Sequence, residues 1–368
     1  MFLINASNLH VGGGVQVAAS FIAELAAFSD LPECLYIWAS DEVDTNLKAS
    51  EANLSNLVHY EVVNTYGPKI LFSPVFKRLN DFDAVFTVFG PLYVSRLRGK
   101  SIIGFAQPWV IYPNNEIYGA MGFTRKWAMR LRRAVQKFFF SRADTYIVEL
   151  EHVREGLRRQ GVGVGKPVNV VRNCVSSIFF YEKLWKPVAL PEKRADVNLG
   201  FVGRNYQHKN TQIFPEIVKQ CRKNYGVEVS IFVTFTQKEW RSCSVEFRKS
   251  VLNVGPLSIA QCPAFYKSMD AVIFPSLLEC FSATPLEAMI MGKPVLASDR
   301  AFNRDVCGDH AVFFDPLSAE DASTAIAEVF LDGSVNDDVL TQARRYAMNF
   351  SNPKSRAEQY LEILLGSL

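Results

Sequence analysis

The chain has 368 residues, of which 49% are hydrophobic and 21% are charged, an ordinary globular composition with enough length for about two domains. Its 40 basic and 37 acidic side chains nearly balance, which argues against a nucleic acid as the main partner. Seven irregularly spaced cysteines, without a CxxC or Cys/His cluster, argue against a disulfide framework and a zinc site. No apolar run approaches the roughly 20 residues that span a bilayer, so the sequence predicts a cytoplasmic protein.

The first half of the chain alternates short apolar runs with helical patterns. A strand at residues 1–7 leads through a glycine-rich segment, NLHVGGG, into a helical pattern at 15–28. A second long helix is predicted over Phe123–Phe140. Further strands are predicted at 34–40, 58–64, 83–89, 101–107, 145–150 and 166–173. Strands of this near-continuous apolar kind, alternating with helices, are typical of a parallel sheet that is covered on both faces.

The second half repeats this alternation after an irregular stretch that contains two prolines. Strands are predicted at 197–203, 227–235, 251–258, 270–276, 293–298 and 311–316. The simplest account is an α/β protein of two doubly wound, Rossmann-like domains, with a ligand-binding cleft between the carboxyl ends of their strands. The predicted divisions are a first domain at 1–178, a linker at 179–196, a second domain at 197–345 and a C-terminal helix at 346–368 that packs on the first domain.

Two glutamates flank the join between a buried strand and a short helix in the second half. The segment FPSLLECFSATPLEAMIMGKPV carries Glu279 before the turn and Glu287 within the helical pattern that begins with TPLEA. Thr284 is a suitable N-cap for that helix, and Glu287 stands three residues later, as in a capping box. Turn amides at a helix N-terminus form a potential anion site. The local alternative is that Glu287 is only a cap and Glu279 a solvated acid.

Two loops, one in each half, follow the first strand of that half. In GFVGRNYQHKN, Gly203 permits a tight turn, and Arg204 and Lys209 together suit a diphosphate, although both could also be solvated cations. In the first half, the successive residues Gly12, Gly13 and Gly14 allow a ligand to approach the backbone at a helix start. The alternative for this glycine loop is a turn that needs unusual dihedral angles.

Together these segments resemble the retaining family 4 glycosyltransferases of the GT-B fold. The resemblance rests on FVGRNYQHKN, NVGPLS, DAVIFPSLLECFSATPLEAMIMGKPVLASD with its Glu-x7-Glu spacing, and GDHAVFFDPLSAEDASTAIAEVF. It covers most of residues 198–330, and the first half only in its alternation and glycine loop. It implies transfer of a sugar from a nucleoside diphosphate to an acceptor hydroxyl, without a metal or other cofactor. GDP- and UDP-sugars both stay open, with mannose-like sugars preferred and assembly of surface polysaccharide such as lipopolysaccharide O-antigen as the setting.

The resemblance also implies roles for individual residues. Glu279 would contact hydroxyls of the donor sugar, Glu287 would bind the ribose, and Arg204 and Lys209 would neutralise the departing diphosphate. The backbone around the join would hold the rest of the donor. The amides of Phe281 and Ser282 would bind the sugar, and those of Ala283 and Thr284 would bind the diphosphate. Gly203 would form the tight turn of the neighbouring loop, and the loop at Gly255 would contact the base. Gly12, Gly13 and Gly14 would face the donor phosphate and the acceptor.

The chain departs from the family at several positions. Cys280 and Ser282 stand where glycines are common, and Gln107 stands near the place of a frequent histidine. His10 and His208 lie in the two loops and are secondary candidates for contact with substrate. Two other functions stay open: a nucleotide-sugar epimerase of the same architecture, and a non-catalytic nucleotide-sugar-binding protein.

The helical pattern at Phe123–Phe140 places a basic stripe beside an apolar one. Between Gly119 and Ala143 there are seven basic residues and no acidic residue. The first interpretation is a peripheral contact of Arg125–Lys137 with an anionic membrane on the cytoplasmic side. The second is a helix that packs its apolar stripe (Trp127, Leu131, Ala134 and Phe138) on the sheet and leaves a solvated basic face.

Overall fold

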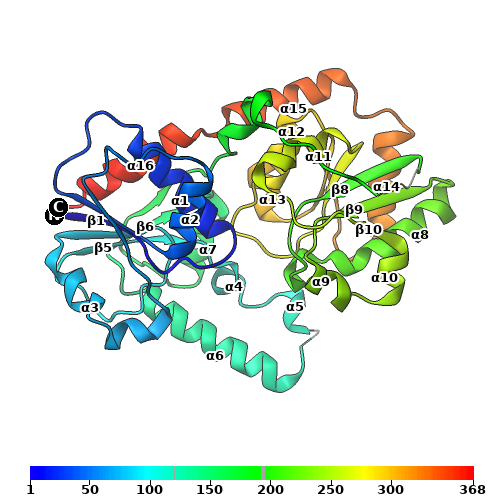
Figure 1. Ribbon diagram of the computed structural model, residues 1–368. Helices are drawn as coiled ribbons and strands as arrows, with labels where there is room; N and C mark the ends of the chain where they lie inside the picture. Colours follow the sequence, from blue (N-terminus) through cyan, green and yellow to red (C-terminus); the bar gives the residue numbers. More distant parts are fainter. Residues whose placement is uncertain (120, 192–194) are drawn as a thin grey trace. The chain divides into compact units, whose positions relative to one another are not determined.

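A computed structural model describes residues 1–119, 121–191 and 195–368 of the chain. The chain forms two compact units (Figure 1). Unit 1 contains Met1–Cys174 and Asn352–Leu368, and unit 2 contains Val175–Ser351. The boundary between the two units therefore falls after residue 174, and the segment predicted as a linker groups with unit 2. Residues 192–194 of that segment lie outside the described residues. That segment contains two short 3-10 helices, η3 (Ser177–Phe180) and η4 (Glu182–Leu184).

Unit 1 is built on a parallel sheet of seven strands in the order β3-β2-β1-β4-β5-β6-β7. Its strands are β1 (Phe2–Ala6), β2 (Leu35–Ala39), β3 (His59–Val62), β4 (Ala84–Thr87), β5 (Lys100–Phe105), β6 (Thr145–Val148) and β7 (Val168–Val170). Each of the seven predicted strands of this half is confirmed. The chain winds outward from β1 in both directions, so the strand order reverses between β1 and β4, as in a doubly wound fold.

The helices of unit 1 begin with α1 (Gly13–Ala26), whose Phe21 lies in the core beside Phe86 of β4. The others are α2 (Asp41–Ala49), α3 (Val75–Arg78), α4 (Pro108–Ile111), α5 (Glu116–Gly119), α6 (Phe123–Phe140) and α7 (Glu151–Arg159), with the 3-10 helices η1 (Gly67–Phe72) and η2 (Leu79–Asp81). The bounds predicted for α6 are confirmed.

The last helix of the chain, α16 (Pro353–Leu365), belongs to unit 1. Tyr360 is fully buried, and its ring centroid lies 5.0 Å from that of Phe21 and 5.2 Å from that of Phe86. Arg356 is also buried, and its guanidinium donates hydrogen bonds to the side chains of Asn173 and Ser20. Because a buried cation needs polar partners, these contacts fix where α16 lies on the unit.

Unit 2 repeats the same winding with six parallel strands in the order β10-β9-β8-β11-β12-β13. The strands are β8 (Val197–Phe201), β9 (Val229–Val233), β10 (Val251–Asn253), β11 (Ala271–Phe274), β12 (Val295–Ser298) and β13 (Val312–Phe314). All six predicted strands are confirmed. Strand β11 is buried along its whole length, because helices cover both faces of a parallel sheet.

Helices follow the strands of unit 2 as the alternating pattern predicts. They are α8 (Phe214–Tyr225), α9 (Gln237–Ser242), α10 (Val245–Ser250), α11 (Cys262–Lys267), α12 (Thr284–Ile290), α13 (Ala301–Cys307), α14 (Ala319–Phe330) and α15 (Asp337–Phe350), with the 3-10 helices η5 (Gln207–Lys209), η6 (Thr211–Ile213) and η7 (Ile259–Gln261). The predicted α/β class with two doubly wound, Rossmann-like sheets is confirmed.

Candidate active site

The candidate site of unit 2 lies where its strand order reverses. Strands β8 and β11 are neighbours, and the chain leaves them toward opposite sides of the sheet. The two loops that follow, at residues 202–206 and 275–283, therefore start at the same edge of the sheet with no helix between them. The amide of Leu277 donates a 2.8 Å hydrogen bond to the carbonyl of His208, which ties the second loop to the 3-10 turn η5 after the first. This topology brings together side chains that are 70 residues apart in the chain.

Lys209 and Glu279 form an ion pair at this junction. The Lys209 Nζ lies 2.7 Å from Glu279 Oε1, and the two side chains are only 14% and 12% exposed. The same ammonium lies 4.8 Å from the ring centroid of Phe274, at the end of β11. A pair this sheltered is screened little by salt, so both charges act at short range on whatever enters the junction.

His208 lies next to the pair. Its Nε2 is 3.9 Å from Glu279 Oε1. Burial, opposed by the Glu279 carboxylate and aided by the Lys209 ammonium, lowers the pKa of His208. Its ring is therefore mostly neutral at pH 7, and Lys209 is the cation that faces Glu279.

Arg204 has a different partner from Lys209. Its Nε donates to both carboxylate oxygens of Glu239, at 2.8 and 3.0 Å, and its side chain is half exposed. Glu239 also closes a capping box with Thr236 at the start of α9. Burial works against ionisation of Glu239, but the hydrogen bonds from Thr236 and Arg204 outweigh it and hold the pKa of Glu239 below its usual value. Glu239 was not predicted as a site residue, although the Thr-x-x-Glu spacing at 236–239 indicates this capping box.

The turn between Glu279 and α12 differs from its predicted capping. Helix α12 begins at Thr284, so its N-cap residue is Ala283, which has no side-chain oxygen to offer. The predicted N-cap role of Thr284 and the capping box with Glu287 are therefore wrong. The amides of Phe281, Ser282 and Ala283 donate no hydrogen bond to another residue in the part of the chain that the structure describes. These three donors stay available to an acceptor from outside the protein.

Glu287 is bound from the side of α11 instead. The hydroxyl of Tyr266, which is fully buried, donates a 2.7 Å hydrogen bond to Glu287 Oε2. Burial raises the pKa of Glu287 to about 7, with the hydrogen bond from Tyr266 working in the opposite direction. Burial and the neighbouring carboxylate also raise the pKa of Tyr266, so the phenol stays the proton donor of the pair. No local sequence pattern signals Tyr266, because it reaches Glu287 from another helix.

The two predicted glycines of unit 2 shape loops at the same edge of the sheet. Thr234 Oγ1 accepts a 3.0 Å hydrogen bond from the amide of Gly203 and donates to its carbonyl at 3.2 Å. Gly255 has a φ of +92°, in the region that favours glycine, and its amide donates to Asn253 Oδ1 at 3.3 Å. Both loops are thereby held by side chains at the ends of neighbouring strands.

The remaining predicted residues belong to unit 1. Gly12 is the N-cap of α1 with a φ of +77°, and a Cβ at either Gly12 or Gly13 would meet no atom within 4 Å. The ring nitrogens of His10 face Glu42 Oε2 at 2.7 Å and the carbonyl of Thr65 at 2.9 Å. These contacts give His10 a structural role beside the glycine loop. Gln107 is the N-cap residue of α4, without a side-chain capping bond.

Gly14, the third glycine of the loop, is packed more tightly. A Cβ at Gly14 would lie 3.4 Å from the Phe89 ring and 3.5 Å from the Leu9 side chain. Asn8 Nδ2 donates a 2.8 Å hydrogen bond to the carbonyl of Phe89, which holds the loop against the end of β4. The loop is thus anchored at Gly14 and open to solvent at Gly12 and Gly13.

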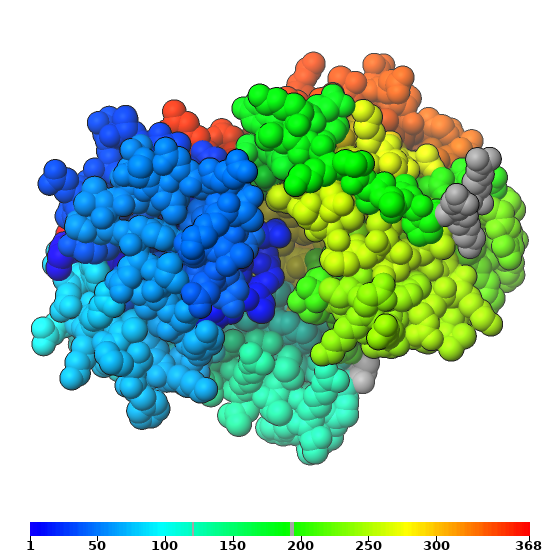
Figure 2. Space-filling view, viewed as in Figure 1, coloured from blue at the N-terminus to red at the C-terminus, as the bar shows by residue number. Residues whose placement is uncertain are grey.

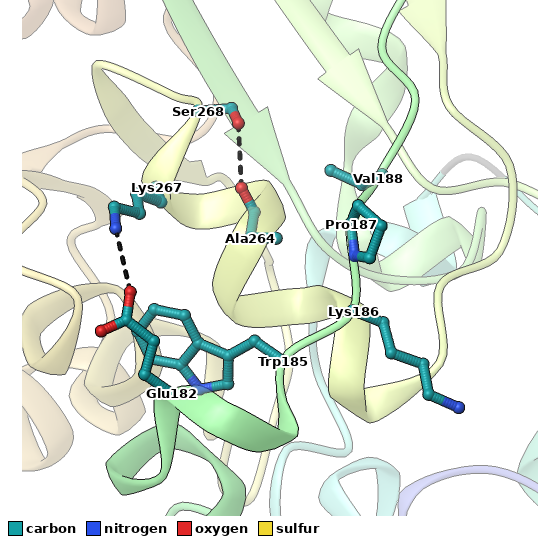
Figure 3. Close-up of a pocket in the computed structure, with 8 residues that line it drawn as sticks. All are labelled: Glu182, Trp185, Lys186, Pro187, Val188, Ala264, Lys267 and Ser268. Carbon is teal, nitrogen blue, oxygen red and sulfur yellow. Dashed lines mark hydrogen bonds and ion pairs between the residues drawn. The ribbon is translucent and has the colours of Figure 1, made fainter.

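Unit 2 also has a surface groove of about 420 Å³ between η4 and α11 (Figure 3). In it, Lys267 Nζ lies 3.2 Å from Glu182 Oε1 and 5.8 Å from the ring centroid of Trp185. The lining residues are Glu182, Trp185, Lys186, Pro187, Val188, Ala264, Lys267 and Ser268. None of the predicted site residues is among them, and two of its charges neutralise each other, so the groove carries no part of the site.

Two features are absent from the described residues: a metal-ligand cluster and a membrane-spanning helix. Among residues 1–119, 121–191 and 195–368, no group of three or more His, Cys, Asp or Glu side chains could hold a metal ion. In the same ranges, no helix is both long enough and apolar enough to cross a membrane.

Comparison with known proteins shows that part of unit 2 is similar to a described family. Residues 196–332 match the family described as Glycosyl transferases group 1. This match covers β8 to α14, and so includes both loops of the candidate site. The finding supports a glycosyltransferase and agrees in part with the resemblance seen in the sequence.

Two curated proteins are similar to the chain. The O-antigen chain mannosyltransferase RfbU of Salmonella typhimurium (strain LT2) is 24% identical over 168 residues, which are 45% of this chain and 47% of that protein. An uncharacterized 41.2 kDa protein in the cps region of Klebsiella pneumoniae is 24% identical over 250 residues, 65% of this chain and 67% of that protein. The chain thus matches about half the length of RfbU.

Solved structures similar to this chain share its fold from end to end. Sucrose-phosphate synthase from Thermosynechococcus elongatus has a TM-score of 0.71 at 17% identity, over 100% of this chain and 98% of that one. WaaG, a glycosyltransferase involved in lipopolysaccharide biosynthesis, has a TM-score of 0.71 at 13% identity, over 99% of both chains. HepE from Anabaena, solved with UDP-glucose, has a TM-score of 0.69 at 14% identity, over 100% and 99%. These likenesses confirm the predicted GT-B fold.

Proposed function

We propose that the chain is a retaining glycosyltransferase that transfers a sugar from a nucleoside diphosphate sugar to an acceptor hydroxyl, in the assembly of a surface polysaccharide. The observation that carries the proposal is the sheltered Lys209–Glu279 ion pair at the point where the strand order of unit 2 reverses. Ligands of doubly wound sheets bind at such points. The family match spans both residues of the pair, and RfbU, a mannosyltransferase of O-antigen chains, supports the setting.

Charge builds up on the leaving diphosphate when the bond between sugar C1 and phosphate breaks. Lys209 is already held at the junction by Glu279, so it costs little to orient when the diphosphate arrives. Arg204 supplies a second cation by turning from Glu239, which its half-exposed side chain has room to do. Both cations stabilise the state in which the diphosphate departs more than they stabilise the bound donor, as catalysis requires.

The turn before α12 provides neutral hydrogen-bond donors for the same ligand. In the proposal, the amides of Phe281 and Ser282 hold the sugar, and those of Ala283 and Thr284 hold the diphosphate. Glu279 accepts hydrogen bonds from sugar hydroxyls while it keeps Lys209 in place. This arrangement accounts for three amides that have no acceptor within the described residues.

Glu287 binds the ribose hydroxyls of the donor in this proposal. Tyr266 donates to Oε2 of its carboxylate, and in the proposal Oε1 accepts from the diol. Gly203 and Gly255 shape the neighbouring loops, with the one at Gly255 against the base. Gly12, Gly13 and Gly14 receive the donor phosphate and the acceptor in unit 1.

Retention follows from attack on the face of the sugar that the diphosphate leaves. The bond from C1 to the phosphate oxygen breaks, the acceptor oxygen bonds to C1 on the same side, and the acceptor proton passes to a phosphate oxygen of the leaving group. No protein nucleophile is needed, so Glu279 positions the donor. The cations of the chain supply the charge neutralisation that a metal provides in other transferases, and the reaction is proposed to proceed without one. The donor is a GDP- or UDP-sugar, preferably mannose-like, given the similarity to RfbU.

One observation favours a second function, a nucleotide-sugar epimerase. An epimerase needs an acid and a histidine near the sugar, and His208 lies 3.9 Å from Glu279. The two functions differ in their products. An epimerase interconverts donor sugars and needs no acceptor, whereas a transferase releases the nucleoside diphosphate and joins the sugar to the acceptor.

The test is incubation of the full chain with GDP-mannose, UDP-glucose and related donors, with and without saccharide acceptors. Release of nucleoside diphosphate is measured by coupled assay, and the anomeric configuration of the product by NMR. We expect release that falls 100- to 1,000-fold in Glu279→Gln and is unchanged in Glu216→Gln, an exposed control glutamate of the same unit. Inverted product would exclude retention, epimerised donor would favour the epimerase, and tight binding without turnover would favour a binding protein.

A further inference from the structure

Helix α6 presents its apolar stripe to solvent. Of the stripe predicted from the sequence, Trp127, Leu131 and Phe138 are 56%, 68% and 49% exposed, and the structure adds Phe123 and Val135, which are 76% and 41% exposed. Their spacing of three or four residues places them on one face of the helix. Leaving five large apolar side chains in water on one face is unfavourable, which indicates that another surface covers them.

The opposite face of α6 holds the helix on unit 1. Gln136 and Phe140 are buried there, and the Phe140 ring centroid lies 4.6 Å from that of Phe105 in β5. Arg133 turns the same way, with its guanidinium 5.6 Å from the ring centroid of Trp109 in α4. The helix thus packs through its less apolar face, and the alternative in which the apolar stripe packs on the sheet is wrong.

Cations flank the apolar stripe on both sides. At 100° per residue, Lys126, Arg130 and Lys137 fall along one border of the stripe, and Arg125 and Arg132 along the other. In the described part of the chain, no carboxylate lies within ion-pair distance of these five side chains. The surface of α6 (teal in Figure 2) therefore combines exposed apolar side chains with unneutralised positive charge.

We propose that α6 lies in the headgroup region of an anionic membrane, with the apolar stripe inserted and the flanking cations on lipid phosphates. Helices with an apolar face bordered by Lys and Arg bind in this way, with the helix axis parallel to the bilayer. The positive borders match an anionic lipid surface and disfavour a second copy of the same helix, whose cations would meet these at close range. The interface belongs to unit 1 and does not depend on the proposed chemistry of unit 2.

The test is sedimentation of the full chain with vesicles of pure phosphatidylcholine and with vesicles that contain 30% phosphatidylglycerol. We expect at least tenfold tighter binding to the anionic vesicles, weakened by salt. The double variant Trp127→Ser/Leu131→Ser should lose at least tenfold in affinity for anionic vesicles. The control, Val245→Ser/Leu317→Ser, changes two unit 2 side chains that are 60% and 58% exposed and should bind as the wild type does.

A second pair of variants tests the charges. Arg130→Gln/Lys137→Gln should weaken binding to anionic vesicles and reduce its dependence on salt, whereas Lys219→Gln/Arg222→Gln, on exposed cations of unit 2, should change neither. Circular dichroism and thermal unfolding of each variant show that it is folded. Insertion of the helix into the headgroup region is measured by the fluorescence of Trp127. Its emission should shift to shorter wavelength with anionic vesicles, and Trp127→Phe should bind the vesicles without this shift.

Three results would overturn the proposal. Equal binding to neutral and anionic vesicles would remove the role of the cations. No vesicle binding, with a dimer by light scattering that Trp127→Ser/Leu131→Ser converts to a monomer, would assign the stripe to a second copy of the chain. Vesicle binding that survives in Trp127→Ser/Leu131→Ser would place the lipid contact elsewhere.

Discussion

Glu287 makes the stability of unit 2 depend on pH, and a single substitution should remove that dependence. Burial raises its pKa to about 7 from the ordinary value of 4.5. Between these two pH values, the folded chain binds a proton that the unfolded chain releases, so stability falls as the pH rises through this window. Above pH 7 the loss is complete, and at about 1.4 kcal/mol per pH unit it amounts to about 3 kcal/mol.

Glu287→Gln should remove this loss. Glutamine stays neutral at all pH values, and its carbonyl oxygen can still accept the hydrogen bond from Tyr266. The variant and the wild type should therefore unfold at similar temperatures near pH 4.5. At pH 8 the variant should be more stable by up to about 3 kcal/mol, or roughly 6–12 °C in the unfolding midpoint of a domain of this size.

The assay is differential scanning calorimetry of both proteins from pH 4.5 to pH 8.5, with attention to the transition of unit 2. Glu216→Gln is the control, because Glu216 is exposed and hydrogen bonds from Gln220 and Lys219 lower its pKa, which gives the opposite sign. A Glu287→Gln variant that is no more stable than the wild type at pH 8 would refute the reasoning. It would mean that the carboxylate is ionised and well solvated in the folded protein.

Three further predictions concern the donor site and the glycine loop. Lys209→Ala should lower donor turnover by 100- to 1,000-fold, measured as nucleoside diphosphate release, because Glu279 is left unpaired and the leaving group loses its nearest cation. Arg204→Ala should lower turnover at least tenfold with little change in thermal stability. Arg222→Ala, which removes a comparable exposed ion pair, should change neither turnover nor stability. If Arg204→Ala turns over the donor as fast as the wild type, Arg204 has only the structural role of its bond to Glu239. Gly12→Ala should lower the free energy of unfolding in urea by about 1 kcal/mol, because Gly12 has a positive φ. Gly13→Ala should leave this free energy unchanged and raise the KM if a ligand approaches the loop. An unchanged KM in Gly13→Ala would count against that contact.

Much of the architecture follows from local sequence patterns. Each predicted strand is present, and α6 runs over the predicted Phe123–Phe140, because near-continuous apolar runs and helical spacing are decided by neighbouring residues. The meeting of Lys209 and Glu279 was also predictable, since both loops follow strands at which the order of a doubly wound sheet reverses.

The partners of individual side chains depended on tertiary structure. Arg204 binds Glu239 and Glu287 binds Tyr266, and each pair joins segments whose distance is set by helix packing rather than by spacing in the chain. Thr284 is a residue type that is common at N-caps, yet the backbone at Ala283 is already close to helical, so the helix starts one residue earlier than predicted.

Which face of α6 packs on unit 1 could also not be predicted from the sequence. Its periodicity shows two faces, and an apolar face usually packs inward. Here the buried face is set by Gln136 and Phe140 against neighbouring elements of unit 1, and Trp127 and Leu131 are left outside. A helical pattern defines the stripes but does not say which of them meets the core.

The most direct test of the account is isothermal titration of the wild type, Lys209→Ala and Arg222→Ala with GDP and UDP. We predict that one of the two nucleotides binds the wild type with 1:1 stoichiometry and that Lys209→Ala weakens this binding at least tenfold, while Arg222→Ala binds as the wild type does. If neither nucleotide binds, or if Lys209→Ala binds as tightly as the wild type, the junction of β8 and β11 is not the donor site.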